Sequence, residues 1–158
     1  MAESILDNKK ILIVDDEPDV ITVVEQEIIE RCKDPKIDKA VNYENAAQLL
    51  KLNDYDLVVL DIMGVRGFDL LEIAVARKFK VAMLTAHALS PEALRKSHDL
   101  GARAYLPKDK LGELVPLLED VMRNDDYQTS WGQLMEKLDN YFKQQWGSDW
   151  RKKEVINW

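Results

Sequence analysis

The chain has 158 residues, 46% hydrophobic and 32% charged, which is typical of a globular protein with one domain and an extension. A formal charge of −7 and a pI near 4.9 argue against a general nucleic-acid binder, which needs a basic face to replace condensed counterions. No apolar run approaches the roughly 20 residues that span a bilayer, so no membrane anchor is predicted. The single cysteine, Cys32, can form no intrachain disulfide, and the first ten residues lack a secretory signal pattern. Together these features predict a cytoplasmic protein.

Strand-like and helix-like runs alternate from residue 10 to about residue 123. Predicted strands cover residues 11–14, 37–41, 57–61, 80–85 and 102–106. Each precedes a predicted helix, and these helices cover residues 18–32, 43–52, 68–78, 90–101 and 112–124. Parallel neighbouring strands need crossover connections, which are usually helical. Five such pairs therefore predict a doubly wound α/β fold with a five-stranded parallel sheet and helices on both faces.

Several helix boundaries have a local cause in the sequence. Pro18 suits the first turn of a helix, where its missing N–H has no intrahelical acceptor. Ser90 has the character of an N-cap, and Gly101 fits a left-handed position at a helix end. Pro116 would break a helix interior, which places the start of the last helix close to Gly112.

The residues after this alternating region differ in pattern. Apolar side chains at steps of three and four predict an amphipathic helix whose stripe comprises Trp131, Leu134, Leu138, Tyr141 and Gln145, widened by Met135, Phe142 and Trp146. The chain is thus predicted to consist of a domain over residues 1–124 and a helical, tryptophan-rich extension over residues 125–158. The extension is expected to dock on the domain or on a second subunit through the side of Trp131, Leu134, Leu138 and Phe142. Its tryptophans suit either an interface or an ordinary core.

Polar residues at the predicted strand ends carry the chemistry. Ligands of open parallel α/β sheets bind at the carboxyl ends of the strands. There the sequence places the acidic pair Asp15 and Asp16, and then Asp61, Thr85 and Lys108. Carboxylate oxygens suit Mg²⁺, a carboxylate can attack phosphorus, and a lysine and a hydroxyl can bind phosphoryl oxygens. The pattern predicts a phosphate and Mg²⁺ site.

Four motifs give a resemblance to a known family. The segments "VDDEP" (14–18), "LVVLDIM" (57–63), "AMLTA" (82–86) and "GARAYLPKD" (101–109) resemble the receiver domain of two-component response regulators, the CheY-like family with a flavodoxin-like sheet. The resemblance implies that Asp61 accepts a phosphoryl group, with Thr85 and Lys108 contacting it. It further implies that Mg²⁺ binds to Asp15, Asp16, Asp61 and the backbone carbonyl of Met63, and that Tyr105 is the family's aromatic switch. For Tyr105, simple half-buried packing is the alternative.

The sequence also departs from the family pattern. Gly64 stands where a proline is usual, and Asp109 follows Lys108 where receivers usually carry a cis-proline. Asp61 and Thr85 are 24 positions apart, a few fewer than usual, which predicts a short third helix or following loop. These differences affect loop geometry and remove no reactive group.

The resulting expectation is a signalling module without a DNA-binding output domain. It takes a phosphoryl group from a histidine kinase or phosphotransfer protein and switches a contact with an output protein. The sequence does not identify the oligomeric state, and a homodimer through the tail or through the last strand and helices is one option. The alternatives are a degenerate receiver acting as a scaffold and an aspartyl-phosphate phosphatase, although Met63 stands where such phosphatases carry a second aspartate. Hydrolysis is expected to be no more than slow self-dephosphorylation, with Met63 and His87 lining the water route.

The remaining glutamate, cysteine and histidine candidates are expected to have structural or surface roles. Glu17 is expected to be a solvated or capping carboxylate, and Cys32 a structural thiol. His87 and His98 have no evident partners and are expected at the surface.

Overall fold

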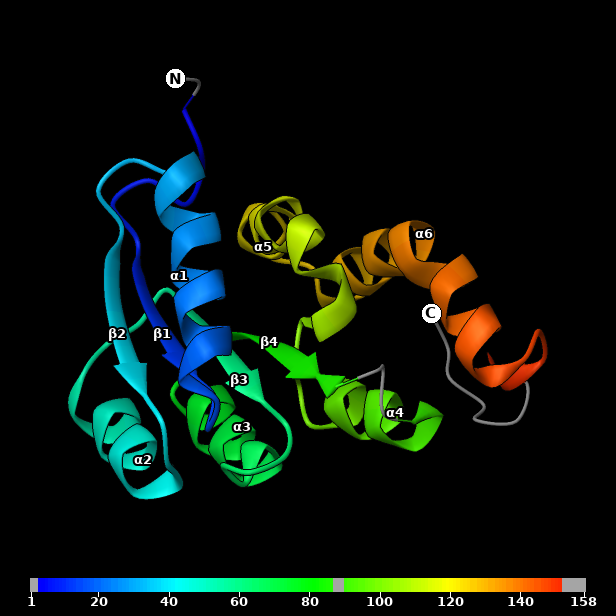
Figure 1. Cartoon of the computed structure of the whole chain (residues 1–158), viewed down its shortest axis with the longest axis horizontal. Helices are drawn as coiled ribbons and strands as arrows, with labels where there is room; N and C mark the ends of the chain where they lie inside the picture. The colour runs from blue at the N-terminus through cyan, green and yellow to red at the C-terminus, as the bar shows by residue number, and fades with distance from the viewer. Residues whose placement is uncertain (1–2, 87–89, 152–158) are drawn as a thin grey trace.

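The computed structural model describes residues 3–86 and 90–151, and its centre is a five-stranded parallel sheet (Figure 1). The strands are β1 (Lys10–Val14), β2 (Lys36–Ala40), β3 (Leu57–Asp61), β4 (Lys80–Thr85) and β5 (Ala104–Pro107). The helices are α1 (Pro18–Arg31), α2 (Tyr43–Leu52), α3 (Gly67–Ala76), α4 (Pro91–Asp99), the 3₁₀ helix η2 (Lys108–Glu113), α5 (Leu114–Arg123) and α6 (Tyr127–Trp146). The strand order is β2-β1-β3-β4-β5, which confirms the predicted doubly wound fold.

Helices cover both faces of the sheet. Figure 1 shows α1 and α5 on one face and α2, α3 and α4 on the other. All residues of β3 are buried, as expected for a strand with apolar neighbours on both faces. Within residues 3–86 and 90–151, no helix combines the length and apolar character needed to cross a membrane.

The local boundary signals act largely as predicted. Pro18 begins α1, and the Ser90 hydroxyl accepts a hydrogen bond of 3.1 Å from the backbone N–H of Ala93 at the start of α4. Gly101 has a φ of 102°, a left-handed conformation that suits glycine. The last βα helix begins later than predicted, because the turn η2 occupies residues 108–113 and α5 then carries Pro116 in its first turn.

The predicted tail helix exists, and it packs on the rest of the chain. Helix α6 lies against α5 and β5 and buries Ser130, Trp131, Leu134, Met135, Leu138 and Phe142. The inclusion of Gln145 in the apolar stripe was wrong, because this side chain is exposed. Trp150, which follows the turn at Gly147, is 1% exposed and joins the same core.

The two edges of the sheet differ in exposure, because α6 covers only one of them. The edge strand β2 leaves Lys36 and Lys39 exposed, and such charges discourage pairing with another chain. The opposite edge strand, β5, has every residue buried. Its cover comes from α6, together with the flanking helices α4 and α5.

Candidate functional site

Three carboxylates meet at the carboxyl ends of two neighbouring strands. Asp15 follows β1, Asp16 comes next, and Asp61 is the last residue of β3, which pairs directly with β1. An oxygen from each lies within 4.8 Å of the others. Asp15 and Asp61 are buried, and Asp16 is exposed. The structure therefore brings together the acidic residues that the sequence predicted.

Burial and like charge make this cluster expensive to ionise. Desolvation, followed by the charge of Asp15, raises the pKa of Asp61 to about 7. Desolvation also raises the pKa of Asp15, against the opposing effect of hydrogen bonds from the Glu17 backbone and from Lys108. A bound cation would relieve both penalties.

Lys108 supplies positive charge to the cluster. Its Nζ lies 2.9 Å from Asp15 Oδ2, 3.2 Å from Asp61 Oδ1 and 3.2 Å from Glu17 Oε1. Burial opposes the charge on Lys108, but the carboxylates of Asp15 and Asp61 outweigh it and raise the lysine pKa above its ordinary value. The ammonium group thus stays charged and bridges the two buried acids.

Glu17 is solvated, as predicted, yet it also takes part in this network. Its side chain is 62% exposed, and it occupies the N-cap position of α1 without a side-chain capping bond. Its contact with Lys108 was missed in the sequence analysis. The two residues are 91 positions apart, so no local pattern could indicate the pair.

Thr85 adds a hydroxyl at the same edge of the sheet. It follows Leu84, the register partner of Asp61, and is itself the register partner of Pro107, which precedes Lys108. It is 1% exposed, and its Oγ1 makes no hydrogen bond of normal geometry with any residue in the described ranges. A buried hydroxyl without a hydrogen-bond partner costs free energy, and a ligand that hydrogen-bonds to it would remove this cost.

Tyr105 is fully buried rather than half-buried, and its burial alone does not decide between simple packing and a switch role. Its hydroxyl donates a hydrogen bond of 3.4 Å to the carbonyl oxygen of Ser90. Burial raises the pKa of this phenol, against the opposing effect of the neighbouring Thr85 side chain and Ser90 backbone. The position beside Thr85 suits a switch residue, while the switch role itself stays a prediction.

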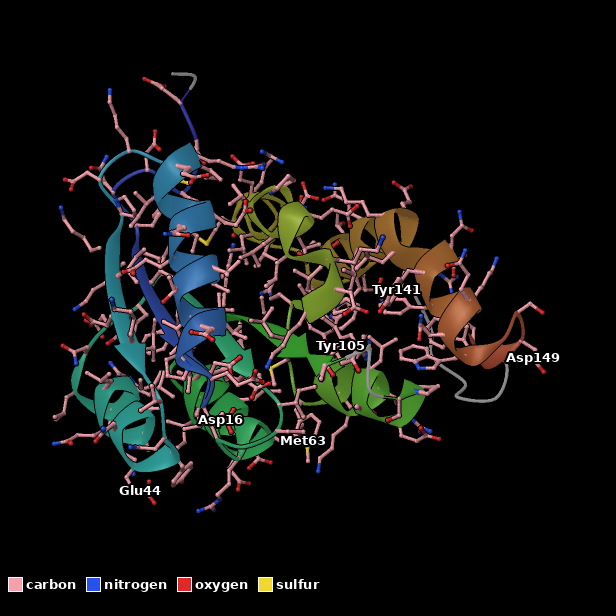
Figure 2. The ribbon with its side chains drawn as sticks, in the orientation of Figure 1. Asp16, Glu44, Met63, Tyr105, Tyr141 and Asp149 are labelled. Carbon is pink, nitrogen blue, oxygen red and sulfur yellow. The ribbon has the colours of Figure 1, made fainter. Side chains whose placement is uncertain are left out.

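The donor set fits Mg²⁺. The ion prefers oxygen ligands, usually one or two carboxylates together with waters and phosphate oxygens. Asp15, Asp16 and Asp61 supply such oxygens at the edge of the sheet where Thr85 ends β4. In the view of Figure 2, the labels of Asp16 and Met63 lie at the end of the sheet to which β1 and β3 point. The Met63 side chain is 63% exposed, and the role of its carbonyl stays a prediction.

Gly64 leaves room for one of these ligands. Its φ is 83°, and a Cβ at this position would lie 2.3 Å from Asp16 Oδ2. Any side chain here would have to displace the carboxylate, and a proline could not adopt the observed φ. The observed position of the Asp16 carboxylate therefore depends on the glycine at position 64.

Other singular residues lie outside the site or outside the described ranges. His98 was expected at the surface, but its side chain is only 18% exposed and its ring lies 5.2 Å from that of Trp131. Cys32 is buried, and desolvation raises its thiol pKa, which suits a structural thiol. His87 falls outside the described residues.

Comparisons with known proteins agree with this geometry. The family model described as the response regulator receiver domain matches residues 11–119. The transcriptional regulatory protein YvrH of Bacillus subtilis (strain 168) is 32% identical over 108 residues, covering 65% of this chain. The chain spans less than half of that relative, since the match covers 44% of it.

Solved structures show the same fold. The receiver domain of the Francisella response regulator 1452 matches with a TM-score of 0.64 and 24% identity, covering 73% of this chain and 98% of that one. A LuxR-family response regulator from Aurantimonas sp. SI85-9A1 matches with a TM-score of 0.65 and 21% identity, covering 83% and 98%. The BeF₃-activated DrrB receiver domain matches with a TM-score of 0.62 and 21% identity, covering 73% and 98%.

Proposed function

Because the chain belongs to the response regulator receiver family, we propose that Asp61 accepts a phosphoryl group in a Mg²⁺-dependent reaction and thereby switches a protein contact. The observation that carries this proposal is the placement of Asp61. It is a buried carboxylate with an ammonium group at 3.2 Å and two further carboxylates beside it, at the sheet edge where ligands of such folds bind.

The phosphoryl transfer itself requires little acid-base catalysis by the protein. An oxygen of Asp61 forms a bond to phosphorus while the bond from phosphorus to the donor's leaving group breaks, and the electron pair departs with that group. When bound, Mg²⁺ would supply positive charge that offsets the phosphoryl and carboxylate charges. Asp15 and Asp16 would hold the ion, with the Met63 carbonyl as a further ligand.

Two other residues complete the binding of the phosphoryl oxygens. Lys108 already lies beside Asp61 and carries a charge, so it can pair with one oxygen. The hydroxyl of Thr85 can donate to another and would thereby satisfy a buried polar atom. Tyr105, packed next to Thr85, would transmit the change to the face formed by α4, β5 and α5.

The donor would be a histidine kinase or a phosphotransfer protein, which is the usual source of phosphoryl groups for receivers. The receiver would act through a separate output protein, and its own hydrolytic activity would be limited to slow self-dephosphorylation. The cytoplasmic location and the homodimer remain predictions. The domain boundary after residue 124 is also a prediction.

Intact-protein mass spectrometry tests this proposal. Incubation with acetyl phosphate and Mg²⁺ should add one phosphoryl group to the wild type, and nothing to Asp61→Asn or to a sample with the metal chelated. A wild type that binds Mg²⁺ but stays unmodified would refute the proposal and favour the scaffold alternative.

A further inference from the structure

Helix α6 contacts both sides of the short segment that carries Lys108. The hydroxyl of Tyr141 donates a hydrogen bond of 2.8 Å to Asp109 Oδ2, on the residue directly after Lys108. The ring of Phe142 packs 6.1 Å from that of Tyr105, on the other side of the lysine in sequence. Figure 2 shows Tyr105 and Tyr141 between the sheet and α6. Neighbouring residues of one helix therefore hold both flanks of Lys108.

These contacts come from a firmly held part of α6. The Phe142 ring is fully buried, stacks on Trp146 at 4.9 Å and packs edge-on against Trp150 at 5.8 Å. Lys110 places its ammonium group 5.4 Å from the centre of the Tyr141 ring. A shift of the Lys108 segment would thus have to break the bond to Tyr141 or move the helix with it.

The observed position of Lys108 fits the unmodified site. Its Nζ lies 3.2 Å from Asp61 Oδ1, which is direct ion-pair contact with no room for a phosphoryl group between the two atoms. A phosphoryl group on this oxygen would therefore displace the ammonium from its present contact with Asp61. Lys108 and Asp109 are consecutive at the start of η2, so part of that displacement reaches Asp109.

We propose that Tyr141 is a positioning residue that holds the Lys108 segment through Asp109, so that docking of α6 and occupation of Asp61 by a phosphoryl group oppose each other. This inference rests on the proposed function and goes beyond it by assigning a role to the tail. Because coupling between two sites is reciprocal, a phosphoryl group loosens α6, and a weakened α6 contact favours the phosphoryl group.

Binding of beryllofluoride to the full chain in the presence of Mg²⁺ tests the coupling at equilibrium. By calorimetry, Tyr141→Phe should bind this phosphoryl mimic about five-fold more tightly than the wild type. Tyr141→Phe introduced into an Asp109→Ala background should cause no further change, because the hydrogen bond is already absent. This comparison cancels the effect of the lost Asp109 charge on anion binding.

Tyr55→Phe provides a matched control. It removes a tyrosine hydroxyl that donates to an aspartate, Asp38, at 2.6 Å, but it lies before the amino end of β3, away from the site. Its affinity for beryllofluoride should equal that of the wild type. Hydrogen exchange adds a second readout, and beryllofluoride should speed amide exchange in residues 138–146.

The outcomes separate the two proposals. Binding to the wild type with unchanged affinity in Tyr141→Phe, or with unchanged exchange in α6, would overturn the coupling and leave the proposed function intact. Failure of the wild type to bind beryllofluoride and to accept a phosphoryl group would overturn both.

Discussion

Replacing Asp61 with asparagine should stabilise the metal-free protein at neutral and alkaline pH. The carboxylate is buried beside Asp15, and desolvation together with this like charge outweighs the help from Lys108. Asparagine keeps the size of the side chain and removes the charge. The variant that abolishes the proposed phosphorylation should therefore unfold less readily than the wild type.

The pKa of Asp61 sets the size and the pH range of this effect. An unfolded aspartate titrates near pH 3.9, whereas Asp61 titrates near 7 in the folded chain. Between these values the folded state holds more protons, so the free energy of unfolding of the wild type falls as pH rises. The full difference corresponds to about 4 kcal/mol. For a chain of this size that is on the order of 10 °C in Tm.

Urea denaturation of both proteins in chelator, from about pH 4 to about pH 8, measures this difference. The two free energies of unfolding should agree at the acidic end and diverge through the range, with Asp61→Asn the more stable. Mg²⁺ should then stabilise the wild type more than the variant, since the ion binds the folded state through the carboxylate. A variant that is less stable than the wild type at pH 8 would refute the assignment of a costly buried charge.

Three further changes test other parts of the account. Gly64→Ala should weaken Mg²⁺ binding about 10-fold or more, because its Cβ would lie 2.3 Å from Asp16 Oδ2, and an unchanged affinity by titration would contradict this role. Phe142→Ala should lower the free energy of unfolding by about 3–5 kcal/mol, whereas Gln145→Ala on the exposed face should change it little. Truncation after residue 124 should lower the urea midpoint, and the docking of the tail would be refuted if both the stability and the oligomeric state stayed as in the full chain.

The sequence predicts the fold because its local signals agree with the tertiary structure. The apolar run of β3 is long enough only for a strand, and it is buried on both faces as its composition requires. Pro18 and Ser90 mark helix starts by chemistry that acts within one turn. Where a boundary depended on longer-range geometry, as at η2 before Pro116, the prediction missed by two residues.

The acidic cluster was also predictable, because the topology of a parallel sheet places strand ends together. Asp15 and Asp61 meet because β1 and β3 are neighbours, a placement that follows from the fold. The space left by Gly64 was not predictable. The Asp16 carboxylate occupies the place where a Cβ would stand, and no local sequence pattern indicates this.

Contacts between distant surfaces were beyond the sequence pattern. Helical periodicity indicated which face of α6 is apolar, but not where along the domain that face would sit. The hydrogen bond from Tyr141 to Asp109 therefore had no local signal. Gln145 was misassigned because it shares the periodicity of the buried stripe, although its own side chain is exposed.

The central claim, that Asp61 is the phosphoacceptor, is tested most directly by locating the modified residue. After incubation with acetyl phosphate and Mg²⁺, borohydride reduction would convert an aspartyl-phosphate to homoserine, which peptide mapping can place. The account predicts the conversion at Asp61, within the tryptic peptide of residues 52–66. Conversion at Asp15 or Asp16, or at no residue despite bound Mg²⁺, would contradict it.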